Sequence, residues 1–169
     1  MRIKLTYKGL IIALFTFAVS LTYAQDNLKI KGLSFVGSSS PIDNADVAPI
    51  VTMNANWVTL MPYGFVGKNG VVTYNSKWQW WGEKEEGVKE TIELCKAAGL
   101  KIMLKPQIWM MSAYTGDYKL PNEEEWLKFE KSYAEFIFSF LEIAIAHDVE
   151  MFCIGTEWRE FIKARPVFW

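Results

Sequence analysis

Short apolar runs alternate along this chain with amphipathic segments in which apolar residues recur every three or four positions. The short runs predict β-strands at residues 28–36, 56–61, 100–104 and 149–154. The amphipathic segments predict helices at residues 43–53 and 83–98 and a long helix beginning at Asn122, and a further helix or turn is expected at residues 160–164. Long loops are predicted at residues 63–82 and 105–121.

The helix beginning at Asn122 has the clearest boundary signal. Asn122 is a favourable N-cap, and Glu125 follows three residues later, at capping-box spacing. A continuous apolar stripe follows, formed by Trp126, Phe129, Tyr133, Phe136, Ile137, Phe140, Leu141 and Ala144. Gly99 is placed to end the preceding helix in the left-handed conformation.

Alternating strands and helices predict the α/β class with a parallel sheet. Both a doubly wound open sheet and a (β/α)8 barrel have this pattern. The turn at residues 37–41 contains neither a GxGxxG nor a Walker motif, which disfavours a nucleotide-binding open sheet. A barrel needs about 250 residues. We therefore expect residues 25–169 to form the N-terminal half of a barrel, ending after its fourth strand, with unpaired strand edges.

The first 24 residues have the pattern of a secretory signal peptide. Arg2, Lys4 and Lys8 precede an apolar stretch at residues 10–19, and small residues at 22–24 fit a cleavage site before Gln25. The apolar stretch is too short to span a bilayer comfortably. We expect a secreted or periplasmic protein with no membrane contact after cleavage.

Charge and cysteine usage exclude several classes of protein. The leader contains three of the 18 basic residues, which leaves 15 basic against 19 acidic residues and no basic cluster for nucleic acid. Cys95 and Cys153 are expected to be free thiols, and His147 has no ligand partner at metal-binding spacing. It is instead expected at a helix C-terminus. No metal or cofactor is expected, and the sequence does not indicate an oligomeric state.

Glu157 is the strongest candidate for chemistry. It follows a buried strand and the pair Gly155-Thr156. An unpaired buried carboxylate is costly, and (β/α) enzymes carry their catalytic groups at the carboxyl ends of such strands. Strand alternation places Glu157 with Cys153 and Met151 on one face of the sheet. The alternative is a structural ion pair, with Lys105 as one partner.

The carboxyl ends of the second and third strands supply further polar and aromatic groups. Tyr63 follows the second strand, and Lys105, Gln107 and Trp109 follow the third. Three of the chain's eight tryptophans, Trp78, Trp80 and Trp81, lie in the second loop. Sugars combine apolar faces with hydroxyl edges, so this mixture indicates a carbohydrate cleft. The alternative for the three tryptophans is packing within their own loop.

Four segments together resemble glycoside hydrolase family 113, at residues 32–37, 55–65, 99–109 and 152–158. The resemblance covers nearly all of the chain after the leader. It implies a (β/α)8 retaining hydrolase, and the characterised members act on β-1,4-mannan. The expected partner is therefore a polysaccharide or oligosaccharide substrate.

The resemblance also implies residue roles. Glu157 corresponds to the general acid/base, and Tyr63, Lys105 and Trp109 resemble substrate-binding positions. Gln107 and Trp81 are added as substrate-binding candidates. The nucleophile of such enzymes is a Glu at the seventh strand, beyond this chain, so we expect the chain alone to be inactive. The alternatives are a non-catalytic carbohydrate-binding fragment and an unstable truncated product that aggregates or dimerises through its strand edges.

Overall fold

The computed structural model describes residues 29–111 and 113–169. The chain divides into two compact units, residues 1–31 and 32–169, and every helix and strand named below belongs to the second unit. The predicted leader at residues 1–24 lies outside the described residues. None of the helices in the described part of the chain has the length and apolar character needed to cross a bilayer.

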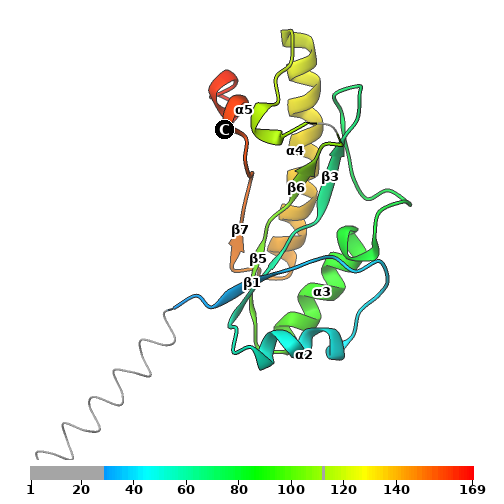
Figure 1. Ribbon diagram of the computed structural model, residues 1–169, viewed down its shortest axis with the longest axis vertical. Coiled ribbons are helices and arrows are strands. Elements are labelled where there is room, and N and C mark those ends of the chain that lie inside the picture. Colours follow the sequence, from blue (N-terminus) through cyan, green and yellow to red (C-terminus); the bar gives the residue numbers. More distant parts are fainter. Residues whose placement is uncertain (1–28, 112) are drawn as a thin grey trace, which may run out of the picture. The chain divides into compact units, whose positions relative to one another are not determined.

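A four-stranded sheet carries the fold, with strand order β1-β2-β5-β7 (Figure 1). All three strand pairings are parallel. The strands are β1 (Gly32–Phe35), β2 (Trp57–Leu60), β5 (Lys101–Leu104) and β7 (Met151–Phe152). Because the four strands follow one another across the sheet in chain order, with helices between them, the predicted α/β class with parallel (β/α) units is confirmed.

The helices agree closely with the sequence patterns. They are α2 (Asn44–Thr52), α3 (Glu85–Ala97), α4 (Glu123–Ala146) and α5 (Arg159–Ala164), with short 3₁₀-helices η1 (Trp81–Glu83) and η2 (Thr115–Asp117). The Asn122 side chain accepts a hydrogen bond from the backbone N–H of Glu125 at 3.0 Å. Gly99 ends α3 with φ of +79°, while Leu100 N–H bonds to the Cys95 carbonyl at 3.0 Å. His147 is the C-cap of α4, and Cys95 and Cys153 are free thiols, as expected.

The two long loops were predicted wrongly, because each begins with a strand. β3 (Tyr63–Val66) pairs in parallel with β6 (Gln107–Trp109) and antiparallel with β4 (Val72–Thr73). β3 and β6 continue β2 and β5 beyond Pro62 and Pro106. The register is unchanged, since Leu60 pairs with Leu104 and Tyr63 with Gln107. Proline lacks an N–H and therefore signals a strand end in the sequence.

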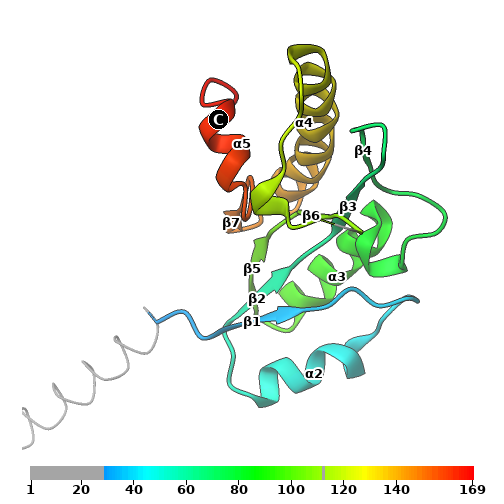
Figure 2. The same cartoon turned by 45° about the horizontal axis from the view of Figure 1, so that its top comes forward.

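The extended ladder has one buried face and one open face. On β2 and β5 the buried residues are Val58, Leu60, Ile102 and Leu104, each at most 4% exposed. They join the side chains of α3 and α4 in one apolar core. The alternate residues, beginning with Trp57 and Lys101, are less buried. Figure 2 shows α2 and α3 on one side of β1 and β2. The open face is therefore the opposite one.

Tyr133 of α4 ties the long helix to the end of β7. Its hydroxyl donates to the Ile154 carbonyl at 2.8 Å and accepts from the Trp158 indole N–H at 2.9 Å. The Tyr133 side chain is only 2% exposed and packs against the rings of Phe129 and Phe161. The hydroxyl thus fixes the chain on both sides of residues 155–157.

We predict that Tyr133→Phe lowers the free energy of unfolding by about 1–3 kcal/mol, because the buried Trp158 N–H loses its acceptor. Backbone hydrogen exchange at residues 155–159 should also accelerate. Urea unfolding and exchange mass spectrometry measure the two effects.

Tyr118→Phe is the matched control. The Tyr118 ring lies in the same aromatic cluster, against Phe129 and Trp158, but its buried hydroxyl has no hydrogen-bond partner among the described residues. Its removal should be neutral or stabilising. Equal losses in the two variants would contradict a specific role for the Tyr133 hydroxyl.

Candidate active site

The open face of the sheet brings together four of the residues singled out from the sequence. Tyr63 is the register partner of Gln107, and Trp109 is the partner of Phe65. Lys105, Gln107 and Trp109 alternate with the buried residues Leu104, Pro106 and Ile108, so they share one face. The rings of Tyr63 and Trp109 meet edge to face, with centroids 6.2 Å apart. Trp109 is 54% exposed and offers an accessible aromatic surface.

Glu157 lies in the turn after β7 and has an unusual backbone. Its φ is +62°, a left-handed conformation that few non-glycine residues adopt. The Glu157 carbonyl accepts the N–H of Arg159 at 2.9 Å, and the adjacent Trp158 is only 3% exposed. The side chain of Glu157 is exposed. A strained backbone held by a buried neighbour is common at functional sites.

The strand leading to Glu157 is shorter than predicted. β7 ends at Phe152, two residues before the expected limit. The predicted alternation holds for the paired residues, because Met151 pairs with Met103 of the open face and Phe152 with Leu104 of the buried face. Beyond Phe152 the Cys153 N–H still bonds to the Leu104 carbonyl at 2.9 Å, and the Tyr133 hydroxyl then holds the Ile154 carbonyl. The turn, and not strand alternation, therefore places Glu157.

Burial and two carboxylates affect the Tyr63 phenol. Burial raises the pKa of Tyr63 above its usual value, and the negative charges of Glu83 and Glu157 raise it further. Glu83 closes η1, after β4, and Glu157 follows β7, so the charges that act on the Tyr63 phenol come from two segments far apart in the chain. This proximity is expected at the carboxyl edge of a parallel sheet.

Glu83 is a site residue that the sequence analysis missed. Glu83, Glu85 and Glu86 occur close together in the sequence. Glu85 and Glu86 lie in the first turn of α3, where their charges complement the helix dipole. Glu83 instead closes η1. Burial raises the pKa of its carboxyl, while a hydrogen bond from Gln79 opposes that shift. The tryptophan-rich segment immediately before it was the available signal.

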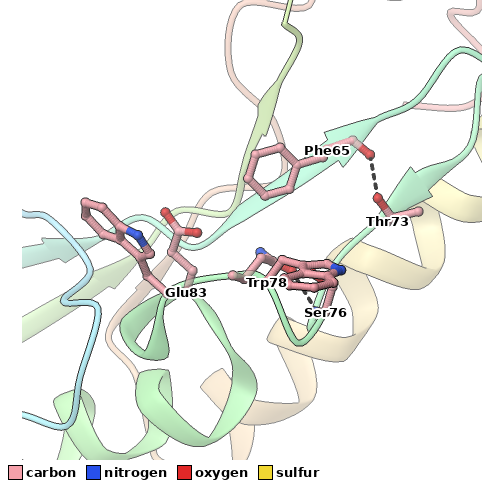
Figure 3. A pocket seen from close by; sticks show the side chains of 7 residues that line it. Phe65, Thr73, Ser76, Trp78 and Glu83 are labelled. Carbon is pink, nitrogen blue, oxygen red and sulfur yellow. Dashed lines mark hydrogen bonds between the residues drawn. The ribbon is translucent and has the colours of Figure 1, made fainter.

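The three loop tryptophans have different surroundings. Trp81 is partly buried, and its indole N–H donates to Glu90 of α3 at 2.5 Å, a contact on the helix side. Among the described residues, no hydrogen bond or ring contact joins Trp81 to Tyr63, Lys105, Gln107 or Trp109. Trp78 and Trp80 are 83% and 52% exposed, so they do not bury one another in a loop core. Both line a hollow with Glu83 and Phe65, shown in Figure 3.

The alternative roles of Glu157 find no support in its contacts. Within residues 29–111 and 113–169, Glu157 forms no ion pair with Lys105 or with any other basic side chain. The described part of the chain also contains no group of three His, Cys, Asp or Glu residues placed to hold a metal ion. The exposed Glu157 carboxylate thus has no charged partner in the described part of the chain.

Charged contacts fix the segment that follows Glu157. Arg159 is paired with Asp117 of η2. Arg165 bonds through Nε to Glu130 and through Nη1 to Glu123, each at 2.5 Å. Glu123 and Glu130 both belong to α4, so the C-terminal end of α5 is held to the same helix that supplies Tyr133.

Comparison with solved structures supports the half-barrel expectation. The chain is similar to the GH113 β-mannanase AaManA from Alicyclobacillus acidocaldarius, solved in complex with ManMIm, with 23% identity and a TM-score of 0.67. That match covers 83% of this chain and 48% of the other. A second GH113 structure, of a β-1,4-mannanase complex, has 20% identity, a TM-score of 0.67 and coverage of 83% and 49%. The chain therefore spans about half the length of these structures, and its parallel (β/α) units have the fold of the corresponding part of their barrels.

A search of curated proteins finds no match. The family model described as Glycoside Hydrolase Family 113 matches residues 39–165, which include every strand from β2 to β7 and the acid at position 157. The sequence motifs, the parallel fold and this match agree, and the chain belongs to Glycoside Hydrolase Family 113.

Proposed function

We propose that this chain is the acid-bearing part of an exported retaining β-mannanase, with Glu157 as the general acid/base. The observation that carries the proposal is the open face itself, on which Tyr63 pairs with Gln107 and packs edge to face against the exposed Trp109. Glu157 follows the last strand of the same parallel sheet, and its charge acts on the Tyr63 phenol. Family membership supports glycoside hydrolysis, and the similar structures, a β-mannanase and a β-1,4-mannanase, favour β-1,4-mannan as the substrate. The leader pattern at residues 1–24 supports export.

The proposed mechanism assigns two successive steps to Glu157. A retaining glycosidase uses two carboxyl groups about 5–5.5 Å apart, of which one attacks the anomeric carbon and the other protonates the leaving oxygen. Glu157 would donate that proton and later remove one from the water that hydrolyses the covalent intermediate. We assign the attacking carboxylate to the part of the whole enzyme that lies beyond the four strands described here.

The open face supports substrate binding. Trp109 and Tyr63 meet edge to face, with 86° between their planes, and the exposed Trp109 indole can stack on the apolar face of a sugar ring. Lys105 can donate hydrogen bonds to sugar hydroxyls, and Gln107 can both donate and accept them. Trp81 remains a candidate from the sequence, although its bond to Glu90 favours a structural role.

We predict that the purified 169-residue polypeptide binds β-1,4-mannohexaose without hydrolysing it, because the aromatic face is present and we assign the attacking carboxylate to another part of the whole enzyme. Calorimetry measures binding, and chromatography of the incubated sugar measures cleavage. Trp109→Ala should weaken binding by about tenfold. Turnover that Glu157→Gln abolishes would contradict the assignment of the nucleophile to another segment, and absence of binding would contradict the substrate class.

The raised pKa of Glu83 predicts a pH-dependent effect on stability. Its folded-state pKa lies above the unfolded value, so its stabilising contribution is present below the unfolded pKa of about 4.5 and is lost as pH rises through the folded pKa. Relative to Glu83→Gln, the wild-type chain should therefore lose free energy of unfolding between pH 4 and pH 7. Urea unfolding of both proteins across this range measures the difference.

Glu123→Gln is the control of opposite sign. Hydrogen bonding to Arg165 lowers the pKa of Glu123, so its contribution is present above the unfolded pKa and is lost as pH falls. The wild-type chain should gain stability over this variant as pH rises. Parallel trends in the two variants would contradict a half-buried Glu83 whose carboxyl is partly desolvated.

A further inference from the structure

A hollow of about 440 Å³ lies at the end of β3, between β3, β4 and η1, and reaches Phe65 of the open face (Figure 3). Its walls include Phe65, Thr73, Trp78, Trp80 and Glu83. Small-molecule sites typically measure about 300–1,000 Å³ and combine aromatic side chains with a few polar groups. The hollow has both the size and the composition of such a site.

A buried amide fixes the loop that forms one wall of the hollow. Gln79 is only 8% exposed. Its Nε2 donates to the Tyr63 carbonyl at 2.6 Å, and its Oε1 accepts from the Ser76 N–H at 2.9 Å. The loop is therefore anchored directly to β3, the strand that also positions Tyr63. This anchoring holds Trp78 and Trp80, on either side of Gln79, in place without burying them.

The two indoles have no packing role that accounts for their position. Trp78 is 83% exposed and Trp80 is 52% exposed, although burial of such large side chains would be strongly stabilising. The Lys77 ammonium lies 4.6 Å from the Trp78 ring centroid, a cation–π contact that orients the indole. Two exposed tryptophans on the rim of one hollow, with one of them oriented, offer aromatic surface to a ligand.

Glu83 connects the hollow to the Glu157 site. It lines the hollow and lies close enough to Tyr63 to act electrostatically on the phenol, as Glu157 also does. In Figure 3 the Glu83 carboxyl points away from the ribbon of its own segment, towards the side on which Phe65 lies. Gln79 bonds to the Tyr63 carbonyl and Phe65 lines the hollow, so a ligand longer than one sugar ring can extend from the open face at Tyr63 to Trp78 and Trp80.

We propose that this hollow is a separate sugar subsite, which takes a hexose ring of a β-1,4-linked glycan whose neighbouring rings occupy the Glu157 site. The exposed indoles would stack on the apolar faces of the sugar, and the Glu83 carboxyl would accept a hydrogen bond from a hydroxyl. The proposal rests on the proposed glycosidase function and adds a specific group of residues that favours long substrates. It gives Trp78, Trp80 and Glu83 a role in binding, whereas the proposed sugar binding at Tyr63 and Trp109 does not depend on these three residues.

The test compares ligands of two lengths, β-1,4-mannobiose and β-1,4-mannohexaose, by calorimetry on the full 169-residue chain. Wild-type protein should bind the hexaose more tightly than the biose. The double variant Trp78→Ala/Trp80→Ala should lose about tenfold or more of its affinity for the hexaose. Trp80→Phe, which keeps an aromatic ring, should retain most of the affinity.

Trp57→Ala is the matched control. Trp57 also lies on the open face of the sheet, but at the amino end of β2, where it pairs with Lys101 of β5. It should leave the affinity for the hexaose unchanged. Circular dichroism checks that each variant is folded.

The outcomes separate this inference from the proposed function. If Trp109→Ala weakens hexaose binding and the double variant does not, the subsite is wrong and the proposed function stands. If the wild-type chain binds neither sugar, the proposed function fails and the subsite fails with it.

Discussion

The unchanged register of the parallel ladder across Pro62 and Pro106 is the constraint on which the site depends. The Lys105 N–H donates to the Leu60 carbonyl at 2.8 Å and the Gln107 N–H to the Pro62 carbonyl at 2.9 Å, so the two prolines interrupt the strands without shifting them. A slip of one residue would exchange the two faces of a strand. Because no slip occurs, Tyr63 and Gln107 stay on the face opposite the helices. The polar and aromatic site is a direct consequence of that pairing.

Features that cost stability gather at the carboxyl edge of this sheet. Glu157 has a left-handed backbone, Glu83 is a carboxyl whose pKa is raised by burial, and Trp78 is almost fully exposed. The helix-facing side of the sheet consists instead of stabilising apolar contacts, with Ile102 and Leu104 completely buried. Proteins tolerate such costs where binding or catalysis needs them, provided that the remaining structure supplies the stability. The long helix α4 supplies much of it here, through its aromatic stripe and the hydroxyl of Tyr133.

Local signals in the sequence were sufficient for most of the fold and for part of the site. Helix boundaries at Asn122 and Gly99 follow from short-range hydrogen bonding, and the parallel order follows from the alternation of strands and helices. The strands after Pro62 and Pro106 were missed because proline removes a donor while leaving the neighbouring ladder intact. Glu83 was missed because its neighbourhood is created by the fold of its loop. Nothing local to Glu157 indicates its φ of +62°, since that conformation depends on contacts with α4 and η2.

The most direct test of the account is a crystal structure of this chain with β-1,4-mannohexaose. The account predicts sugar rings over the open face, in contact with Tyr63 and Trp109, with one glycosidic oxygen within hydrogen-bonding distance of the Glu157 carboxyl. Sugar bound on the helix side of the sheet, or bound with Glu157 turned away from it, would contradict the account.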